Sequence, residues 1–573
     1  MNALFSERLI SVCRTPLALF VGACAFVSQL HGQAVEFSRQ SPAQYTLDRI
    51  GILTQRDMPF HAQLAPYPRP DALIVLKSLD TAAYLPPSVR RDLRDLAEEM
   101  QAETPDSLPF RLPDKRGLWG VFFRSRANFF ALNTPHFSMQ INPMLQWSAD
   151  YDRSDSLFLF ENSRGIEVRG QVDDFIYFYT NLVETQARLP NYVREWAGER
   201  RAIPGAGFFK PFNAQKFDSR ESFDFNVATA YVGFRMSRHI QLQFGHGAHF
   251  IGFGARSLLL SDFGPPRFFL RMHTRVWKLH YQNLFMELSP VSQVQIPDGT
   301  RLPKKYAALH YLSFRPTPRL SFGFFEGTIF HRSRQFEFQY LNPVIFYRTV
   351  EGMIGSPDNI VLGADAHWDI RPGLRLYGQF MLDELIVSEL FSRRGWWGNK
   401  YGLQAGLKYC DAFGVTHLDL QAEFNAVRPY AYAHGDSLNS YTHYNQPLAH
   451  PLGANFAEWI LLARYRPMPR LFLHARWIAY RRGEDQPGKN WGANPLLSYD
   501  QRVQDFDNRI AQGDRRRVSH LTLDLSWHLA PKLFADFRMR IRTSVSDDAP
   551  HTRLAQPFGL ALRWNMWGRD LDW

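Results

Sequence analysis

The chain has 573 residues, with 66 Lys and Arg, 55 Asp and Glu, a net charge of +11 and 15% aromatic side chains. Two of its three cysteines, Cys13 and Cys24, lie close to the N-terminus, which leaves Cys410 alone in the rest of the chain. An internal disulfide and a Cys-based zinc or redox motif are therefore excluded there. The basic charge indicates acidic partners, such as anionic glycans or lipid headgroups, and says nothing about the fold.

Residues 1–34 have the layout of a secretory signal peptide. Basic residues accompany an apolar run at 16–27, and GQA at 32–34 supplies the small residues needed for cleavage after position 34. An alternative is lipid modification of Cys24, because VGAC at 21–24 resembles a loose lipobox. The sequence predicts an exported protein in either case.

Residues 35–118 do not follow a strand pattern. A short helix is predicted at 71–79, and the apolar positions of VRRDLRDLAEEM, residues 89–100, recur at helical spacing with charges between them. The charged face mixes acidic and basic residues, which favours a soluble helix over a membrane-surface one. We predict a small, partly helical periplasmic segment over 35–118.

From about Trp119 the apolar residues recur with a period of two. In LTLDLSWHL, residues 521–529, every odd position is apolar, and 417–426 and 533–542 alternate in the same way. Such strands suit a lipid-facing outside and a wetted lumen. A water-soluble sandwich also alternates, but the leader and the aromatic content favour the membrane. We predict an all-β fold in which residues 119–573 form an outer-membrane antiparallel β-barrel of about 16–18 strands.

The connections fall into two length classes, as they do in barrels of the Gram-negative outer membrane, where short turns face the periplasm and long loops face outward. A terminal aromatic residue, Trp573, follows the last alternating strand and resembles an outer-membrane assembly signal. Residues 245–262 break the pattern with four glycines and an apolar knot, and indicate an outer loop that folds back into the lumen. The predicted turns are 315–318, 371–373, 466–469 and 530–532, and the predicted long loops are 330–359, 388–400, 429–456 and 481–517.

The outer loops carry the candidate binding residues. YTHYNQPLAHPLGANF, residues 441–456, combines two prolines and a glycine with rings and amides, and WWGNK, residues 396–400, adds two indoles. Rings stack on the C–H face of a sugar while amides hydrogen-bond its hydroxyls. The alternative is that these rings form an interfacial girdle or pack the loops into a plug. The tentative ligand-binding set is Trp396, Trp397, Asn399, Tyr441, His443, Tyr444, Asn445 and Gln446.

Other chemistry finds little support in the sequence. The spacing of His434, His443 and His450 matches no compact metal motif, and there is no G-x-S-x-G nucleophile elbow. We therefore expect no enzyme activity, no cofactor and no metal. Arginine clusters such as 515–517 are typical of solvated loops, and can also pair with anionic polysaccharide or lipopolysaccharide.

Four stretches together resemble a known family: GHGAHFIGFGARSLLLSD at 245–262, LNPVIFYR followed by GSPDN within 341–359, WWGNK and YTHYNQPLAHPLGANF. They resemble the capsule-assembly outer-membrane family (Wzi-like), particularly its RemB-like gliding-motility branch, over roughly 223–466. The resemblance implies a barrel with a helical periplasmic element, which acts as a lectin that anchors capsular polysaccharide. It implies no enzyme activity.

Three functions remain open from the sequence. The leading hypothesis is a protein that binds capsular or other surface polysaccharide and helps capsule assembly or attachment. The second is a component of gliding motility or adhesion machinery with protein partners, and the third is a porin-like channel. Outer-membrane lipids are expected partners in each case, and nucleic acid is not.

Overall fold

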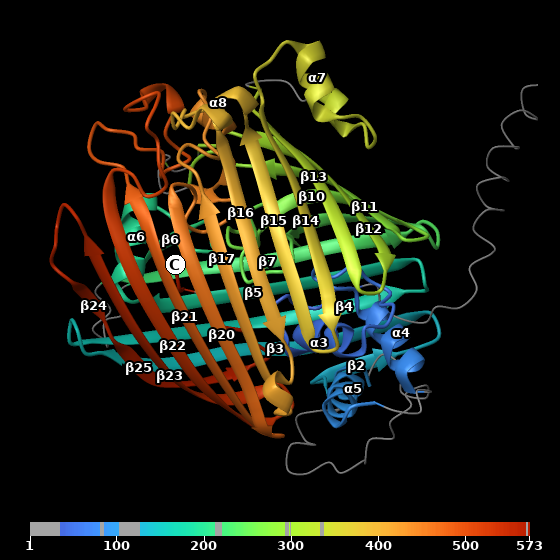
Figure 1. The fold of residues 1–573 in the computed structure, drawn as a ribbon. Coiled ribbons are helices and arrows are strands. Elements are labelled where there is room, and N and C mark those ends of the chain that lie inside the picture. The colour runs from blue at the N-terminus through green and yellow to red at the C-terminus, as the bar shows by residue number, and fades with distance from the viewer. Residues whose placement is uncertain are drawn as a thin grey trace, which may run out of the picture.

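The computed structural model describes residues 35–80, 85–101, 127–212, 221–292, 297, 300–332, 337–568 and 571–573. The predicted signal peptide and the predicted boundary near 119 lie outside these residues. Within them, eighteen strands pair antiparallel with their neighbours and close into a barrel, because β25 pairs with β3 (Figure 1). The predicted barrel class is confirmed.

The wall strands are β3 (Phe137–Asp152), β4 (Leu157–Val172), β5 (Ile176–Arg188), β7 (Ser222–Arg235), β8 (Ile240–Gly247), β10 (Arg267–Val276), β11 (Leu279–Leu288), β12 (Lys305–Thr317), β13 (Leu320–Phe330), β14 (Asn359–Arg371), β15 (Leu374–Glu384), β16 (Lys400–Tyr409), β17 (Leu418–Val427), β20 (Phe456–Met468), β21 (Leu471–Glu484), β22 (Asp514–Ala530), β23 (Leu533–Ser546) and β25 (Pro557–Trp564). Short strands β2 (Phe130–Asn133), β6 (Phe209–Phe212) and β24 (Arg553–Ala555) extend the same sheet. Two small pairs lie outside it, β1 (Leu64–Ala65) with β9 (Phe250–Ile251) and β18 (Thr442–His443) with β19 (Gln446–Pro447).

The helices are α3 (Pro42–Thr54), α4 (Arg69–Asp80), α5 (Pro87–Met100), α6 (Asn191–Arg200), α7 (Tyr347–Ile354) and α8 (Val387–Ser392). Among the described residues, no helix is long and apolar enough to cross a membrane.

The barrel wall has the opposite arrangement to a soluble protein, with apolar side chains facing outward and polar side chains facing the lumen. On β22 the apolar side chains Leu523, Leu525 and Trp527 are exposed, whereas His520 and Ser526 on the other face are buried. An apolar outside with a polar inside matches strands that cross lipid around a polar lumen. The two-residue alternation read from the sequence therefore gave the correct faces of β22.

The two ends of the barrel differ. Tight turns join β12 to β13, β14 to β15, β20 to β21 and β22 to β23, as the sequence predicts, while residues 331–358, 385–399, 428–455 and 485–513 form long connections at the opposite end. Short turns face the periplasm and long loops face outward in this class.

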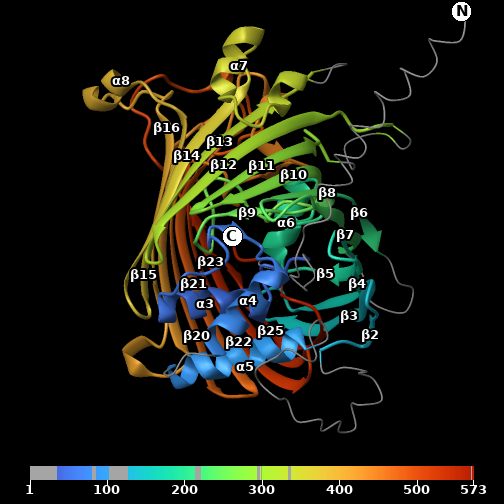
Figure 2. The same ribbon diagram turned by 90° about the vertical axis from the view of Figure 1, so that its right-hand side faces the viewer.

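The N-terminal helices α3, α4 and α5 lie at the short-turn end (Figure 2) and share an apolar core of their own. Arg49 of α3 joins this cap to the barrel: it pairs with Asp92 of α5 at 2.7 Å, with Asp411 at 2.5 Å and with Asp419 of β17. Burial acts against the charge on Arg49, but these carboxylates raise its pKa above the ordinary value. The helical cap, defined as helices α3, α4 and α5, is therefore held in the barrel mouth by buried ion pairs.

The loop between β8 and β10, residues 248–266, enters the lumen as predicted. Its β9 segment pairs with β1 of the N-terminal region, and Leu258, Leu259 and Leu260 are fully buried. A cavity of about 640 Å³ remains between this loop, α3 and strands β20–β23.

The chain also re-enters the lumen after its last strand. That strand ends at Trp564, and Asp572 pairs with Arg256 at 3.0 Å while the Trp573 ring lies 5.2 Å from that of Phe263. The interpretation of Trp573 as an outer-membrane assembly signal stays a prediction. The aromatic residue at the strand end is Trp564.

Candidate functional site

The loop that joins β17 to β20, residues 428–455, lies inside the barrel. The Tyr441 side chain is only 1% exposed, and its hydroxyl donates to the Leu259 carbonyl oxygen at 2.8 Å. Lys305 of β12 donates to the Ser440 carbonyl oxygen at 2.7 Å and ties the loop to the wall. The prediction that this loop faces outward is wrong for Tyr441. Its burial agrees with the alternative in which the rings pack the loops into a plug, because groups in the polar lumen satisfy the polar atoms of the loop.

Three further candidates on this loop make internal hydrogen bonds. His443 Nδ1 accepts from the Ser289 backbone N–H at 3.0 Å, while Asn445 and Gln446 donate to carbonyl oxygens of residues 200–206 at 2.8 and 2.9 Å. Burial, with the nearby positive charges of Arg267 and Lys305, holds the pKa of His443 well below its ordinary value. These side chains fix the loop, and their part in ligand binding stays a prediction.

Two other candidates differ in burial. Asn399 is buried, and its Oδ1 accepts from the Ile386 backbone N–H at 2.9 Å, which closes the β15–β16 loop on itself. Tyr444 is half-buried, with its ring against Gly207, where a Cβ would stand 3.4 Å from the ring. Asn399 thus shapes the loop that carries the indoles, while Tyr444 keeps part of its ring accessible.

The remaining candidates, Trp396 and Trp397, sit on the outer loops and are half-buried. Their ring centroids lie 5.8 Å apart, and the Trp397 ring lies 5.0 Å from that of Tyr499 in the β21–β22 loop. Phe506 of the same loop is exposed. We call Trp396, Trp397, Tyr499 and Phe506 the rim aromatic cluster.

Guanidinium groups accompany the rim aromatic cluster. The Arg502 Cζ lies 4.3 Å from the centroid of the Trp397 ring, and the Arg394 Cζ lies 4.7 Å from that of Phe506. Arg502 also pairs with Asp505 at 2.6 Å. Rings, cations and a carboxylate at one partly exposed place can stack on a sugar ring and hydrogen-bond its hydroxyls.

Backbone hydrogen bonds hold the two loops of the cluster together. The Trp397 N–H donates to the Asp505 carbonyl oxygen at 2.8 Å, and the Asn508 N–H donates to that of Gly395 at 2.9 Å. The sequence did not predict the contributions of Tyr499, Phe506 and Arg502, because about a hundred positions separate them from Trp397. Their one sequence signal is the occurrence of rings in a long polar loop.

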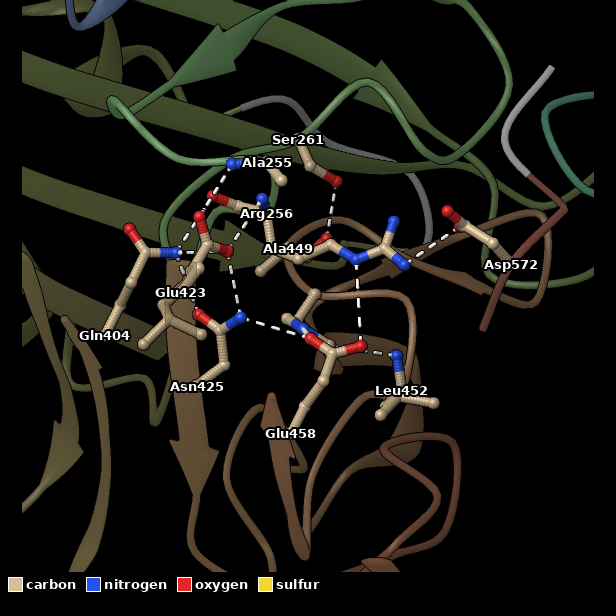
Figure 3. Close-up of polar contacts among 12 residues, drawn as sticks. Ala255, Arg256, Ser261, Gln404, Glu423, Asn425, Ala449, Leu452, Glu458 and Asp572 are labelled. Atoms are coloured by element: carbon tan, nitrogen blue, oxygen red, sulfur yellow. Dashed lines mark hydrogen bonds and ion pairs between the residues drawn. The ribbon is translucent and has the colours of Figure 1, made fainter. Parts of the chain in front are cut away.

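Deeper in the barrel, a polar network joins the inward loops to the wall (Figure 3). Glu423 accepts from the backbone N–H groups of Ala255 at 2.7 Å and Arg256 at 3.1 Å, and Asn425 bridges Glu423 and Glu458. His450 of the β17–β20 loop contacts Glu458 at 2.8 Å. In the described part of the chain, no group of three or more His, Cys, Asp or Glu residues could hold a metal ion.

The closed barrel has an apolar outside, a lumen occupied by its own loops, and aromatic side chains in its outer loops. These features define an outer-membrane β-barrel. A family model described as capsule assembly protein Wzi matches residues 123–546, and the chain belongs to this family. The protein is located in the outer membrane of Gram-negative bacteria. The Wzi-like family expected from the four sequence stretches is confirmed, and the RemB-like branch stays a prediction.

A solved structure shows the same fold. Wzi of Escherichia coli, described as a carbohydrate-binding β-barrel involved in group 1 capsule assembly, is 12% identical, with a TM-score of 0.56 over 93% of this chain and 100% of that chain. OprD of Pseudomonas aeruginosa matches with 9% identity and a TM-score of 0.40 over 74% of this chain and 94% of that chain. A search of the curated proteins gives no match.

Proposed function

We propose that this protein binds capsular or another surface polysaccharide at its outer face and helps to assemble or attach it there. The rim aromatic cluster carries the proposal, because it gathers half-buried indoles and guanidinium groups on two mutually bonded outer loops. An indole offers a flat apolar face to a sugar ring, while charged side chains hydrogen-bond its hydroxyls. The carbohydrate-binding description of the E. coli relative supports the same function.

The protein acts by binding, without transport or catalysis. The helical cap occupies the periplasmic mouth, and residues 248–266 and 428–455 occupy the lumen. A polysaccharide chain therefore stays on the outer surface, where the long loops of the barrel are. A porin-like channel, the third possibility raised by the sequence, predicts stable conductance in a planar bilayer, whereas this proposal predicts none.

The test is retention of polysaccharide by cells that lack the gene and are complemented with variants. Wild-type protein is expected to restore cell-associated polysaccharide, and the Trp396→Ala/Trp397→Ala double variant is expected to release most of it into the medium. Phe391→Ala is the matched control, since Phe391 is 78% exposed on α8 of the same loop and lies outside the rim aromatic cluster. Unchanged cell-associated polysaccharide in the deletion strain, or full restoration by the double variant, contradicts the proposal.

The second candidate is a motility or adhesion component that binds protein partners. It is favoured by exposed apolar side chains around α7, where Phe338, Val344, Phe346 and Met353 are between 70% and 79% exposed. Apolar patches of this kind mark protein interaction sites more often than sugar sites. Loss of surface translocation with normal capsule, on changing these residues to serine, supports this candidate over the first.

A further inference from the structure

A second cavity lies between α6 and the outer ends of β21–β23. These elements lie on the left of Figure 1. Its volume is about 330 Å³, at the small end of the range of ligand pockets. We call it the rim pocket. The lining side chains that matter here are Tyr192, Trp196, Arg200, Tyr480, Arg482 and Arg542.

Arg542 is the unusual member of this lining. The residue is only 8% exposed, its Nη2 donates to the Tyr480 hydroxyl at 3.0 Å, and its Cζ lies 4.5 Å from the centroid of the Tyr192 ring. Its Nη1 is buried and has no hydrogen-bond partner among the described residues. No described carboxylate forms an ion pair with it either. A buried guanidinium without a counter-charge is costly, so an anion from outside the chain fits this position.

The carboxylates that line the rim pocket interact with groups other than Arg542. Glu484 pairs with Arg482 at 2.8 Å, and Glu195 pairs with Arg553 at 2.8 Å. Asp485 accepts from three backbone N–H groups of residues 491–494, at distances of 2.6 to 3.3 Å. These acids therefore neutralise other groups and leave the Arg542 guanidinium available.

Two more acids and two more arginines complete the charge balance. Arg516 pairs with Glu484 at 3.5 Å. Asp514 accepts from the Ser546 hydroxyl at 2.6 Å, and Glu199 is exposed to solvent. Arg200 forms no ion pair with a described residue, and burial, followed by the nearby charge of Arg482, lowers its pKa to about 10. Two guanidinium groups thus face a pocket with no free buried acid among the described residues, beside the aromatic faces of Tyr192 and Trp196.

We propose that the rim pocket binds an acidic sugar residue of the polysaccharide, whose carboxylate pairs with Arg542 while its ring packs on Tyr192 or Trp196. A guanidinium fork suits a carboxylate because two N–H groups meet two oxygens. The proposal rests on the proposed function and specifies its ligand class, a polysaccharide with carboxylate-bearing sugars. It also assigns specificity to a pocket distinct from the rim aromatic cluster.

The test measures binding of purified, detergent-solubilised protein to polysaccharide extracted from the surface of the producing cells. The polysaccharide is used in its native form and after chemical reduction of its carboxyl groups to alcohols. Reduction is expected to weaken binding by tenfold or more, and Arg542→Gln is expected to weaken binding of the native form to a similar extent. Arg542→Lys keeps the positive charge but loses the guanidinium fork, so its affinity for the native polysaccharide is expected to lie between those of wild type and Arg542→Gln.

Arg517→Gln is the matched control. Arg517 lies on the neighbouring strand β22, is exposed and pairs with Asp547 at 2.8 Å, so the variant makes the same charge change outside the rim pocket. Heat-modifiable migration in gels confirms that each variant is a folded barrel. Equal binding of native and reduced polysaccharide, or equal affinity of Arg542→Gln and wild type, overturns the pocket proposal alone. No binding of either polysaccharide by wild type overturns the proposed function itself.

Discussion

The Tyr441 hydroxyl donates a hydrogen bond of 2.8 Å to the carbonyl oxygen of Leu259, although the two residues lie 182 positions apart in the sequence. A second bond, from the Ser261 N–H to the Leu448 carbonyl oxygen at 2.8 Å, runs between the same two loops. The loops therefore form one plug inside the barrel. The outer surface above this plug is where a long polymer can be held.

The hydrogen bonds of Asn455 are expected to stabilise the contact between the plug and the outer loops. It is fully buried, its Nδ2 donates to the carbonyl oxygens of Gly483 and Gln512 at 3.0 and 2.9 Å, and its Oδ1 accepts from the Ala511 N–H at 2.8 Å. Asn455→Ala leaves these buried backbone groups unpaired and is expected to cost about 3 kcal/mol of unfolding free energy. The thermal midpoint in detergent measures this, with exposed Gln501→Ala as control. Equal midpoints for the two variants contradict the assignment.

The helical cap is expected to depend on Arg49. Arg49→Met removes the partner of Asp92, Asp411 and Asp419 and leaves buried carboxylates uncompensated, which typically costs about 3–5 kcal/mol. Proteolysis of the helical cap should then become fast while the barrel keeps its heat-modifiable migration. A cap that stays as resistant as in wild type refutes this role.

Attachment of the helical cap should weaken in acid. Burial alone would raise the pKa of Asp48, but Lys408 at 2.6 Å and Arg375 at 2.8 Å bring it below the ordinary value. Since the folded pKa is the lower one, the stabilisation is complete above the unfolded value of about 4 and is lost as the pH falls through the folded value. The urea midpoint for proteolytic release of the cap should drop from pH 7 to pH 3. Asp48→Asn should flatten this dependence, and an equally steep profile in that variant argues against it.

Tyrosine rings on the lumen side lie over glycines of neighbouring strands. A Cβ at Gly406 would stand 2.1 Å from the Tyr377 ring, which cannot move freely because its hydroxyl bonds to Glu423 at 2.7 Å. Gly406→Ala is expected to cost about 1–3 kcal/mol through overpacking. Gly352→Ala on α7 is the control, as nothing lies within 4 Å of its Cβ. A thermal midpoint that is the same for both variants speaks against the contact.

Much of the barrel could be predicted because its signal is local. The alternation of 521–529 lies within β22, and the helical spacing of 89–100 lies within α5 and covers nearly all of it. The inward direction of the loop at 428–455 could not be predicted. Gln446 faces the lumen because the carbonyl oxygens of residues 203–206 receive its amide. Such contacts, hundreds of positions apart, leave no periodicity in the sequence.

The candidate site was predicted in part. Trp396 and Trp397 lie at the outer rim where the loop pattern placed them, whereas Arg542 looks like any lumen-facing arginine of an alternating strand. Arg542 differs from the others because it has no counter-charge among the described residues. Glu484 pairs with Arg482, and Asp485 accepts from the Trp491 N–H, so neither acid pairs with Arg542. Sequence alone does not show how charges pair inside a barrel.

The most direct measurement of the central claim is the affinity of purified wild-type protein for the polysaccharide of its own cell surface, beside the Trp396→Ala/Trp397→Ala double variant. We predict saturable binding by wild type and at least tenfold weaker binding by the double variant, with both proteins migrating as folded barrels. Wild-type protein that binds no surface polysaccharide, or a double variant with unchanged affinity, would contradict the account.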